Sequence, residues 1–195
     1  MDALAKGDVM CSAYDNESWT GSEYEETALM MRDGLVDKAL AEIKTINERY
    51  DGSKRNPWGE VKCGTHYSRA MASYGVFVAA CGFEYDGPKD AMALAPRVGP
   101  ENFKAAFTSA AGWGSFSQKY AGTGMNAALA LKYGTLSLKS LSLVLPQGGK
   151  GQNVKALIDG KDVPLASSLD GSRLTLHFRA NILLNAGQKL SLTVN

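Results

Sequence analysis

The most distinctive pattern in this chain lies between Asn56 and Tyr85, which reads NPWGEVKCGTHYSRAMASYGVFVAACGFEY. From Cys63 to Phe83 the only charged side chain is Arg69. The residues around Arg69 are apolar or small on nearly every side of a helical repeat, which predicts a buried helix from about Gly64 to Gly82. A buried arginine needs carboxylate or carbonyl partners, because an unpaired buried charge costs roughly several kcal/mol. Glu60 lies just before the helix, so the sequence predicts a small polar cluster at one end of it.

Two further helices are expected before this stretch. The first begins near Ser22, where Ser22 and Glu25 fit a capping box, and stops at Gly34, the position of a C′ glycine. The second runs from Leu35 to about Tyr50 with one apolar stripe, as in a surface helix with one face inward. Only a residue or two separates them, so they should form an antiparallel pair. A surface helix followed by an all-round apolar helix favours a ring of helical hairpins with inner and outer helices.

The chain after Phe83 has a different character. A turn and a proline- and glycine-broken linker come first, and from Met125 onward apolar and polar residues alternate as in β-strands. The alternation slips at Lys139-Ser140, which predicts a bulge or bend. Asp159-Gly160 and Asp170-Gly171 are type I′ hairpin signals between apolar runs. The last third is therefore expected to be an antiparallel, sandwich-like sheet.

Two features of this β region are given no chemical role. The segment 147–152, QGGKGQ, lacks the spacing of a phosphate-binding loop and is read as a hairpin loop. His177 lies inside an alternating run and is read as a strand-face residue.

The composition argues against several classes of protein and site. The net charge is +1 with both signs mixed along the chain, so nucleic acid is not an expected partner. The longest apolar run, Ala70–Gly82, is too short to span a bilayer. The N-terminus has no apolar segment of a secretory signal, which indicates a cytoplasmic location. The cysteines Cys11, Cys63 and Cys81 are odd in number and widely spaced, so we expect reduced thiols. Two histidines, Cys63 and scattered carboxylates offer no metal-ligand spacing, so no metal is expected, and no cofactor is expected either.

Three segments resemble the C-terminal end of glycoside hydrolase family 116. They read WTGSEYEETALMMRDGLVDKAL, RYDGSKRNPWGEVKCGTHYSRAMASYGVFVAACGFEYDGPK and NFKAAFTSAAGWGSFSQ, and the resemblance covers roughly residues 10–120. The block NPW-x-E-x-x-C-G-x-H-Y-x-R-A-M-A-S-Y-G is the longest part of it. This is the family of the non-lysosomal glucosylceramidase, or bile-acid β-glucosidase, and its bacterial relatives.

The resemblance implies a fold class. The family has an (α/α)6 barrel preceded by a β-sandwich domain. The chain is accordingly expected to be α+β: residues 1–95 would be the C-terminal helical hairpins of an (α/α)6 barrel, and residues 96–195 a linker and an antiparallel, sandwich-like β module. A complete barrel needs about twelve helices, whereas the patterns above predict about three, so the chain would be the tail of a longer enzyme.

The resemblance also implies a sugar-binding site. Glu60 and Arg69, nine residues apart, would hold the glycone hydroxyls, and Glu17 and Trp19 in the E-x-W-T-G segment would lie at the same subsite. A carboxylate and a guanidinium suit vicinal hydroxyls, because charge-assisted hydrogen bonds are strong. The residues by themselves leave other roles open. Glu60 and Arg69 could be only a buried ion pair, and Trp19 could pack an edge of the core.

A retaining glycosidase needs two carboxyl groups about 5–5.5 Å apart, and in this family both lie upstream of the matched segments. The expected function is therefore the C-terminal portion of a β-glycosidase that binds a β-glucoside or related glycan and is inactive without the rest of the enzyme. One alternative is a non-catalytic carbohydrate-binding module or split-enzyme partner. Another is an independent enzyme that pairs Glu60 with Glu17 or Asp15.

Overall fold

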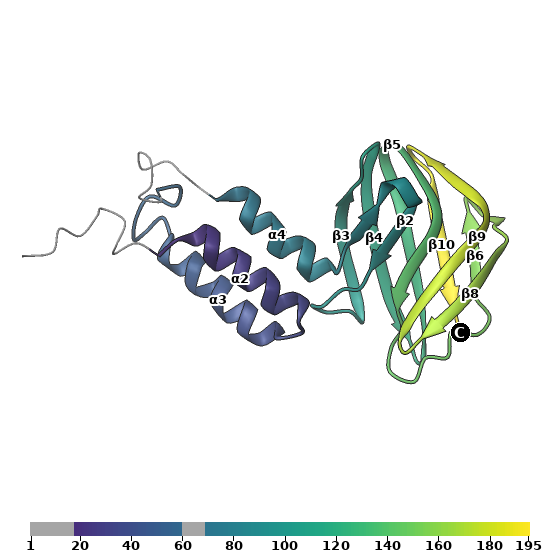
Figure 1. The fold of residues 1–195 in the computed structure, drawn as a ribbon, viewed down its shortest axis with the longest axis horizontal. Coiled ribbons are helices and arrows are strands. Elements are labelled where there is room, and N and C mark those ends of the chain that lie inside the picture. The colour runs from purple at the N-terminus through teal and green to yellow at the C-terminus, as the bar shows by residue number, and fades with distance from the viewer. Residues whose placement is uncertain (1–17, 60–68) are drawn as a thin grey trace, which may run out of the picture. The chain divides into compact units, whose positions relative to one another are not determined.

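The computed structural model describes residues 18–59 and 69–195 of the chain, which divides into two compact units between Ala79 and Ala80 (Figure 1). We call the part up to Ala79 the helical unit and the part from Ala80 the β unit. No helix in the described ranges is both long and apolar enough to cross a membrane.

The helical unit contains α2 (Thr20–Arg32), α3 (Val36–Arg49) and most of α4 (Ala70–Cys81). As expected, α2 and α3 pack together, and a glycine ends α2. Gly34 has a φ of +83°, and Leu35 N donates to the carbonyl oxygen of Met30 at 2.9 Å. This is the hydrogen bond of a Schellman cap, which needs a left-handed residue at the glycine position.

Two sequence-based expectations for these helices were wrong. Helix α2 begins at Thr20, with Trp19 as an N-cap that makes no side-chain cap bond, so Ser22 and Glu25 lie inside the helix and form no capping box. Helix α4 was expected to be buried on nearly every side, yet Met71 is 84% exposed. Tyr74 and Phe77 are also exposed and follow Met71 at helical spacing, so they form one uncovered apolar face. An apolar sequence shows that a helix can be buried, but only neighbouring elements bury it.

The β unit consists of ten strands and one short 3-10 helix. They are β1 (Glu84–Asp86), η1 (Gly87–Lys89), β2 (Ala91–Leu94), β3 (Asn102–Thr108), β4 (Gly112–Ala121), β5 (Gly124–Val144), β6 (Lys155–Ile158), β7 (Lys161–Asp162), β8 (Leu165–Asp170), β9 (Arg173–Asn185) and β10 (Lys189–Val194). The strands are hydrogen-bonded into one continuous sheet. The sheet is mixed, because β2 pairs with β5 in parallel while the other pairs are antiparallel.

This architecture overturns the expected fold class. Strands hold more of the described chain than helices do, and a mixed ten-stranded sheet takes the place of the helical hairpins of an (α/α)6 barrel with an antiparallel β region. Two strands were missed, β1 and β2, because both fall where only a turn and a linker were expected. Strand β2, Ala91–Leu94, carries no alternating pattern. Its partner lies far along the chain, with Ala91 opposite Ser140 and Leu94 opposite Leu143. A strand this short is identified by its partner, and sequence periodicity does not report partners.

Strand β5 belongs to both layers of the folded sheet. Its residues 135–144 pair with β9 and β2 in what we call layer A, which also contains β1 and β8. Its residues 124–134 pair with β4 and β10 in layer B, which also contains β3, β6 and β7. Side chains from both layers meet in one hydrophobic core. The bend falls at Gly134, which has a φ of +71°.

The inward phase of β5 changes twice. Met125 and Leu131 point inward at odd positions, Leu136 and Leu138 at even positions, and Leu141 again at an odd position. The second change is the bulge between Leu138 and Ser140, which the sequence predicts. The first change falls at the register shift between β4 and β5, where Trp113 opposes Tyr133 and Gly114 opposes Leu131, and it was not predicted.

The turns agree with the sequence in part. Asp159 and Gly160 both have positive φ between paired β6 and β7, which confirms the type I′ hairpin. The hairpin between β8 and β9 also exists, but Asp170 pairs with Arg173, and of the two loop residues only Gly171 has positive φ. That pattern is typical of a type II′ turn, so the predicted turn type was wrong.

Of the two segments without an expected chemical role, the glycine-rich loop differs from its prediction and His177 agrees with it. Residues 147–152 connect β5 to β6, which do not pair, so they form a crossover rather than the expected hairpin loop. His177 lies on an exposed face of β9, as expected, 3.4 Å from Ser168 Oγ.

Candidate functional site

The structure describes two of the four residues expected to contact a sugar, Trp19 and Arg69. Glu17 and Glu60, and the alternative catalytic partner Asp15, lie outside the described residues. The described part of the candidate site is therefore Arg69, Trp19 and the surface around them.

Arg69 lies directly before α4, where its carbonyl oxygen accepts a hydrogen bond from Ser73 N at 3.1 Å. Its side chain crosses the first turn of α2 at Gly21. A Cβ atom placed on Gly21 would lie 3.1 Å from Arg69 Cδ and 3.2 Å from Nη1. The missing side chain at Gly21 thus makes room for the guanidinium group.

Trp19 is the N-cap residue of α2. Its carbonyl oxygen accepts hydrogen bonds from the backbone nitrogens of Ser22 at 3.0 Å and Glu23 at 3.1 Å, and these bonds hold its backbone in place. Trp19 is 43% exposed. Trp19 precedes Gly21 by two residues, so the fold brings Arg69 against the segment that carries Trp19. The two sequence blocks on which the sugar-site expectation rests therefore meet in space.

A pocket of about 720 Å³ lies between α2 and α4, and Gly21 is part of its wall. Its polar lining comes from α2 and consists of Ser22, Glu25, Glu26 and Arg32. Its α4 side is formed by Ala72 and Gly75, and a Cβ on Gly75 would meet no atom within 4 Å. The exposed pocket wall is mostly apolar and includes Leu29, while carboxylates, a guanidinium and a hydroxyl stand on its α2 side. Apolar walls with a few polar groups are typical of small-molecule sites.

The sequence patterns did not point to the charged residues of this pocket. They lie in the acidic run of α2, where the sequence indicates only a helix with a capping box. The signal that could have found them is the pair of small residues in α4, because small residues on a facing helix leave space beside charged ones.

The α2–α3 pair carries several carboxylates close together. Burial, followed by repulsion from Glu26 and Glu23, raises the pKa of Glu42 above its ordinary value, although a hydrogen bond with Thr27 opposes this. Arg49 compensates part of this charge by donating from Nη1 and Nη2 to the two carboxylate oxygens of Glu23, at 2.7 and 2.8 Å.

The described part of the chain contains no candidate metal site. In residues 18–59 and 69–195, no three His, Cys, Asp or Glu side chains gather in a way that could hold a metal ion.

Comparison with known proteins leaves the family open. No protein-family model matches this chain, and no curated protein matches it. Among solved structures, the chain is similar to the α-L-rhamnosidase from Dictyoglumus thermophilum, a glycoside hydrolase, with a TM-score of 0.36 and 9% identity. The match covers 70% of this chain and 15% of the rhamnosidase, so the chain spans a small part of that enzyme's length. A likeness of this strength carries no argument about activity, and membership of family 116 is not shown.

Proposed function

We propose that this chain supplies glycone-binding residues to a β-glycosidase of the glucosidase or glucosylceramidase type, related to family 116. The proposed sugar contacts are Arg69 and Trp19, together with Glu60 and Glu17. The observation that supports this proposal is the packing of Arg69 on Gly21, which joins the two segments that resemble the family.

The chemistry of Arg69 and Trp19 suits a pyranose. A guanidinium presents several N–H donors in one plane and can hold two neighbouring hydroxyl oxygens at once. An exposed indole face can pack against the C–H bonds of a sugar ring. The adjacent pocket adds the acceptors of Glu25 and Glu26 and has room for a monosaccharide unit. In this proposal the catalytic carboxyl pair comes from another part of the enzyme.

Saturation-transfer NMR of the full chain with 4-nitrophenyl β-glucoside tests the binding. Part of a site binds weakly, so a Kd of about 1 mM is expected, with the strongest transfer to sugar protons. Arg69→Lys and Trp19→Ala should each weaken the signal, and Gly21→Ala should do so because its new methyl group crowds the Arg69 side chain.

The matched control is Arg55→Ala. Arg55 belongs to the same unit and lies over the ring of Tyr50, 5.4 Å from its centroid, so its loss should leave sugar binding unchanged. Absence of transfer, or equal transfer in all four variants, would contradict the proposal.

The same substrate tests for catalysis. No release of nitrophenol is expected from the pure chain. Release that Glu60→Gln abolishes would overturn the claim that the catalytic pair lies elsewhere.

A further inference from the structure

The outer surface of layer B is a second place where ligand-binding chemistry gathers, and it belongs to the β unit alone. Strands β3, β4, β5 and β10 lie side by side there, and their register brings Asn102, Lys119, Asn126 and Thr193 into one row across the sheet. We call these four residues the amide row. The Thr193 hydroxyl donates to the side-chain oxygen of Asn126 at 3.2 Å, which leaves the Asn126 amide nitrogen as a donor on the surface.

A shallow groove of about 390 Å³ runs over this row. Its floor is formed by small side chains at the next outward positions of the strands, including Ser117, Ala128 and Ser191. Small residues at the centre of a sheet face, with longer ones around them, leave an open channel lined by hydroxyl and amide groups.

The four strands under the groove carry lysines and no carboxylates, whereas the β6–β7 hairpin beside them carries both signs. There Asp159 accepts a hydrogen bond from Lys189 N at 3.1 Å, and Asp162 lies 3.5 Å from Lys155 Nζ. Lys104, Lys119 and Lys189 point outward from β3, β4 and β10, whereas no aspartate or glutamate occupies an outward position on these four strands. None of the three lysines takes part in an ion pair found between described residues. From strand spacing, the Cα atoms of Lys104 and Lys119 are about 8 Å apart, and Lys189 is about 16 Å from either. The face thus offers separated positive charges to an extended anion.

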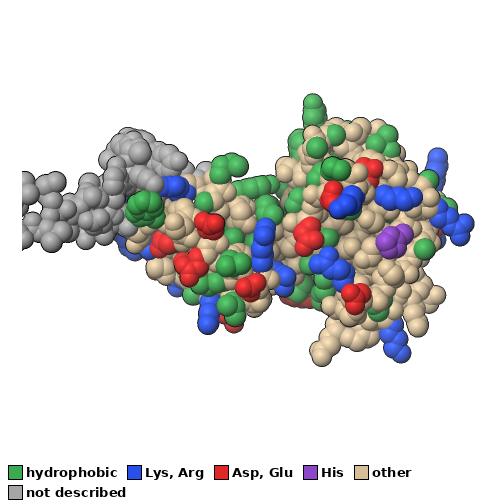
Figure 2. All heavy atoms as spheres, viewed as in Figure 1, with side chains coloured by type: hydrophobic (Ala, Val, Ile, Leu, Met, Phe, Trp, Pro, Cys, Tyr) green, Lys and Arg blue, Asp and Glu red, His purple; other side chains and the backbone are tan. Residues whose placement is uncertain are grey.

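The β unit as a whole is also basic. Residues 80–195 contain twelve lysines and arginines and seven aspartates and glutamates, a net charge of +5, although the whole chain has a net charge of only +1. On the face of the molecule that Figure 2 shows, acidic and basic side chains are interspersed. The absence of aspartate and glutamate from β3, β4, β5 and β10 is therefore a local feature of a unit whose net charge is positive.

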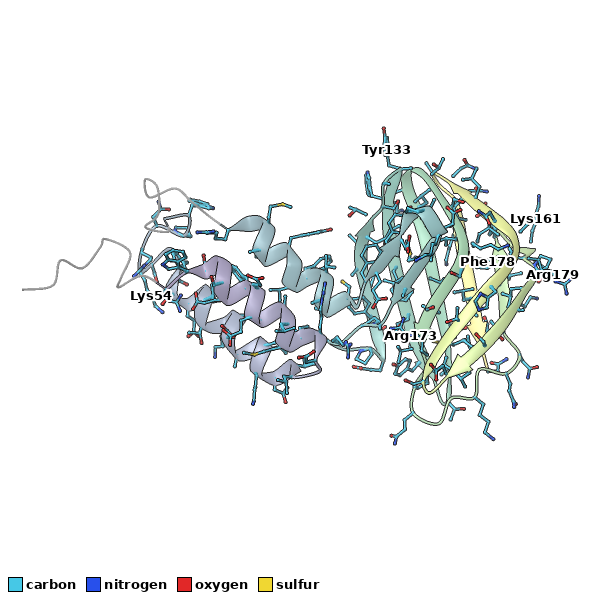
Figure 3. All side chains as sticks on the ribbon, in the orientation of Figure 1. Lys54, Tyr133, Lys161, Arg173, Phe178 and Arg179 are labelled. Carbon is cyan, nitrogen blue, oxygen red and sulfur yellow. The ribbon has the colours of Figure 1, made fainter. Side chains whose placement is uncertain are left out.

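Two exposed aromatic rings lie further along the same strands. Trp113 on β4 pairs with Tyr133 on β5, next to the bulge in this strand pair. Their rings are nearly parallel, with an interplanar angle of 18° and centroids 6.4 Å apart, and they are 51% and 65% exposed. Figure 3 shows Tyr133 projecting from one end of the β unit. The strand rise places this pair about 20 Å from the amide row, a distance that a chain of several sugar units covers.

We propose that the outer face of layer B binds an acidic polysaccharide, a chain of pyranose units that carry carboxylate or sulfate groups. The lysines pair with the anionic groups, the amide row and serines bond the hydroxyls, and the Trp113–Tyr133 pair packs against a sugar ring. Charge complementarity selects the acidic chain, because a neutral glycan leaves three lysines without partners. This proposal is independent of the role proposed for Arg69.

A nucleic acid fits the face less well. It carries a charge on every unit and is usually met by a continuous basic stripe. Here three separated lysines stand among amides and hydroxyls, and the aromatic rings are confined to one end.

The test is affinity electrophoresis of the full chain through gels that contain polygalacturonate or dextran sulfate, the carboxylate and sulfate forms of the ligand. At low ionic strength at least one of them should retard the chain, and added salt should reverse the retardation. Fully methyl-esterified polygalacturonate, which lacks the charge, should not retard it. Which acidic polymer binds identifies the preferred anion.

Variants connect any binding to this face. Lys104→Gln with Lys119→Gln should weaken binding by about tenfold, as expected for the loss of two charge-assisted contacts. Lys139→Gln with Lys150→Gln removes the same charge from exposed positions off this face and should have little effect. The double variant Trp113→Ala, Tyr133→Ala should also weaken binding. Its thermal unfolding temperature should stay near that of the unmodified chain, because both rings are exposed.

Several outcomes would overturn the proposal. One is that neither acidic polysaccharide retards the chain. Another is that the two double lysine variants weaken binding equally, and a third is that removal of both aromatic rings leaves binding unchanged. Tighter binding of oligo-thymidine or poly-glutamate than of either polysaccharide would assign the face to nucleic acid or to acidic protein instead.

Discussion

Gly21 and Gly134 show two ways in which a missing side chain directs this fold. At Gly21 the backbone is helical, and the glycine leaves space that the Arg69 side chain occupies. At Gly134 the φ of +71° bends β5 between the layers, and a Cβ would collide with the carbonyl oxygen of Ala111. The first glycine creates a side-chain site, and the second allows the sheet to fold onto its own core.

Replacing Gly134 and Gly160 by alanine separates backbone strain from steric collision. Both residues have positive φ, but a Cβ on Gly160 meets nothing within 4 Å. Gly160→Ala should therefore lower the free energy of unfolding by only about 1–2 kcal/mol. Gly134→Ala should cost at least about 2 kcal/mol more, because the Ala111 backbone must also move. Urea unfolding measures both, and equal losses would contradict the role given to the Gly134 bend.

The Cys81 thiol should be inert in the folded chain. It is 2% exposed, and burial raises its pKa to about 11. At about pH 8 only about one thiol in a thousand is then the reactive thiolate. A chain with Cys11→Ser and Cys63→Ser should react with a disulfide reagent only after denaturant is added. Rapid labelling of the native form would show that Cys81 is accessible.

At the scale of elements, the α2–α3 pair is held at one end by the Schellman cap at Gly34 and at the other by the Arg49–Glu23 ion pair. Both side chains of this ion pair are largely shielded, at 24% and 22% exposure. A shielded, two-bond pair contributes more than a surface pair because water competes with it less.

Arg49→Lys tests this contribution. Lysine keeps the charge but cannot make two parallel hydrogen bonds to one carboxylate, so the free energy of unfolding should fall by about 1–2 kcal/mol. Lys44→Gln breaks the exposed pair of Lys44 with Glu48, whose atoms are 3.6 Å apart, and should cost less than about 0.5 kcal/mol. Similar midpoints for the two variants in urea unfolding would mean that shielding adds nothing.

At the scale of the whole molecule, the main hydrophobic core lies within the β unit. Every residue of this core cluster, from Phe83 to Val194, follows Ala80 in the sequence. The two layers of the bent sheet bury that core between them, so the β unit holds the contacts that a stable fold needs.

The β unit should therefore fold on its own. Residues 80–195 exceed the length of roughly 70–80 residues above which a single core suffices. This piece should show a cooperative thermal transition and β-type circular dichroism. The full chain should show the same transition in calorimetry. A piece without a cooperative transition would show that the helical unit is needed to complete the fold.

Local patterns in the sequence predicted much of the local structure. Helical period placed α2, α3 and α4, and alternation placed the β region with its bulge between Leu138 and Ser140. Backbone preference located the caps and turns at Gly34 and at Asp159-Gly160. These features could be predicted because each depends on residues within a few positions of one another.

Only the tertiary structure decided how these elements combine. It placed β2 parallel to β5, opened one face of α4, brought Arg69 to Gly21, and set Trp113 beside Tyr133. Each of these contacts joins segments well apart in the sequence or depends on which element covers another. Which of these contacts form depends on the free energy of packing the whole chain. Local periodicity in the sequence does not report that free energy.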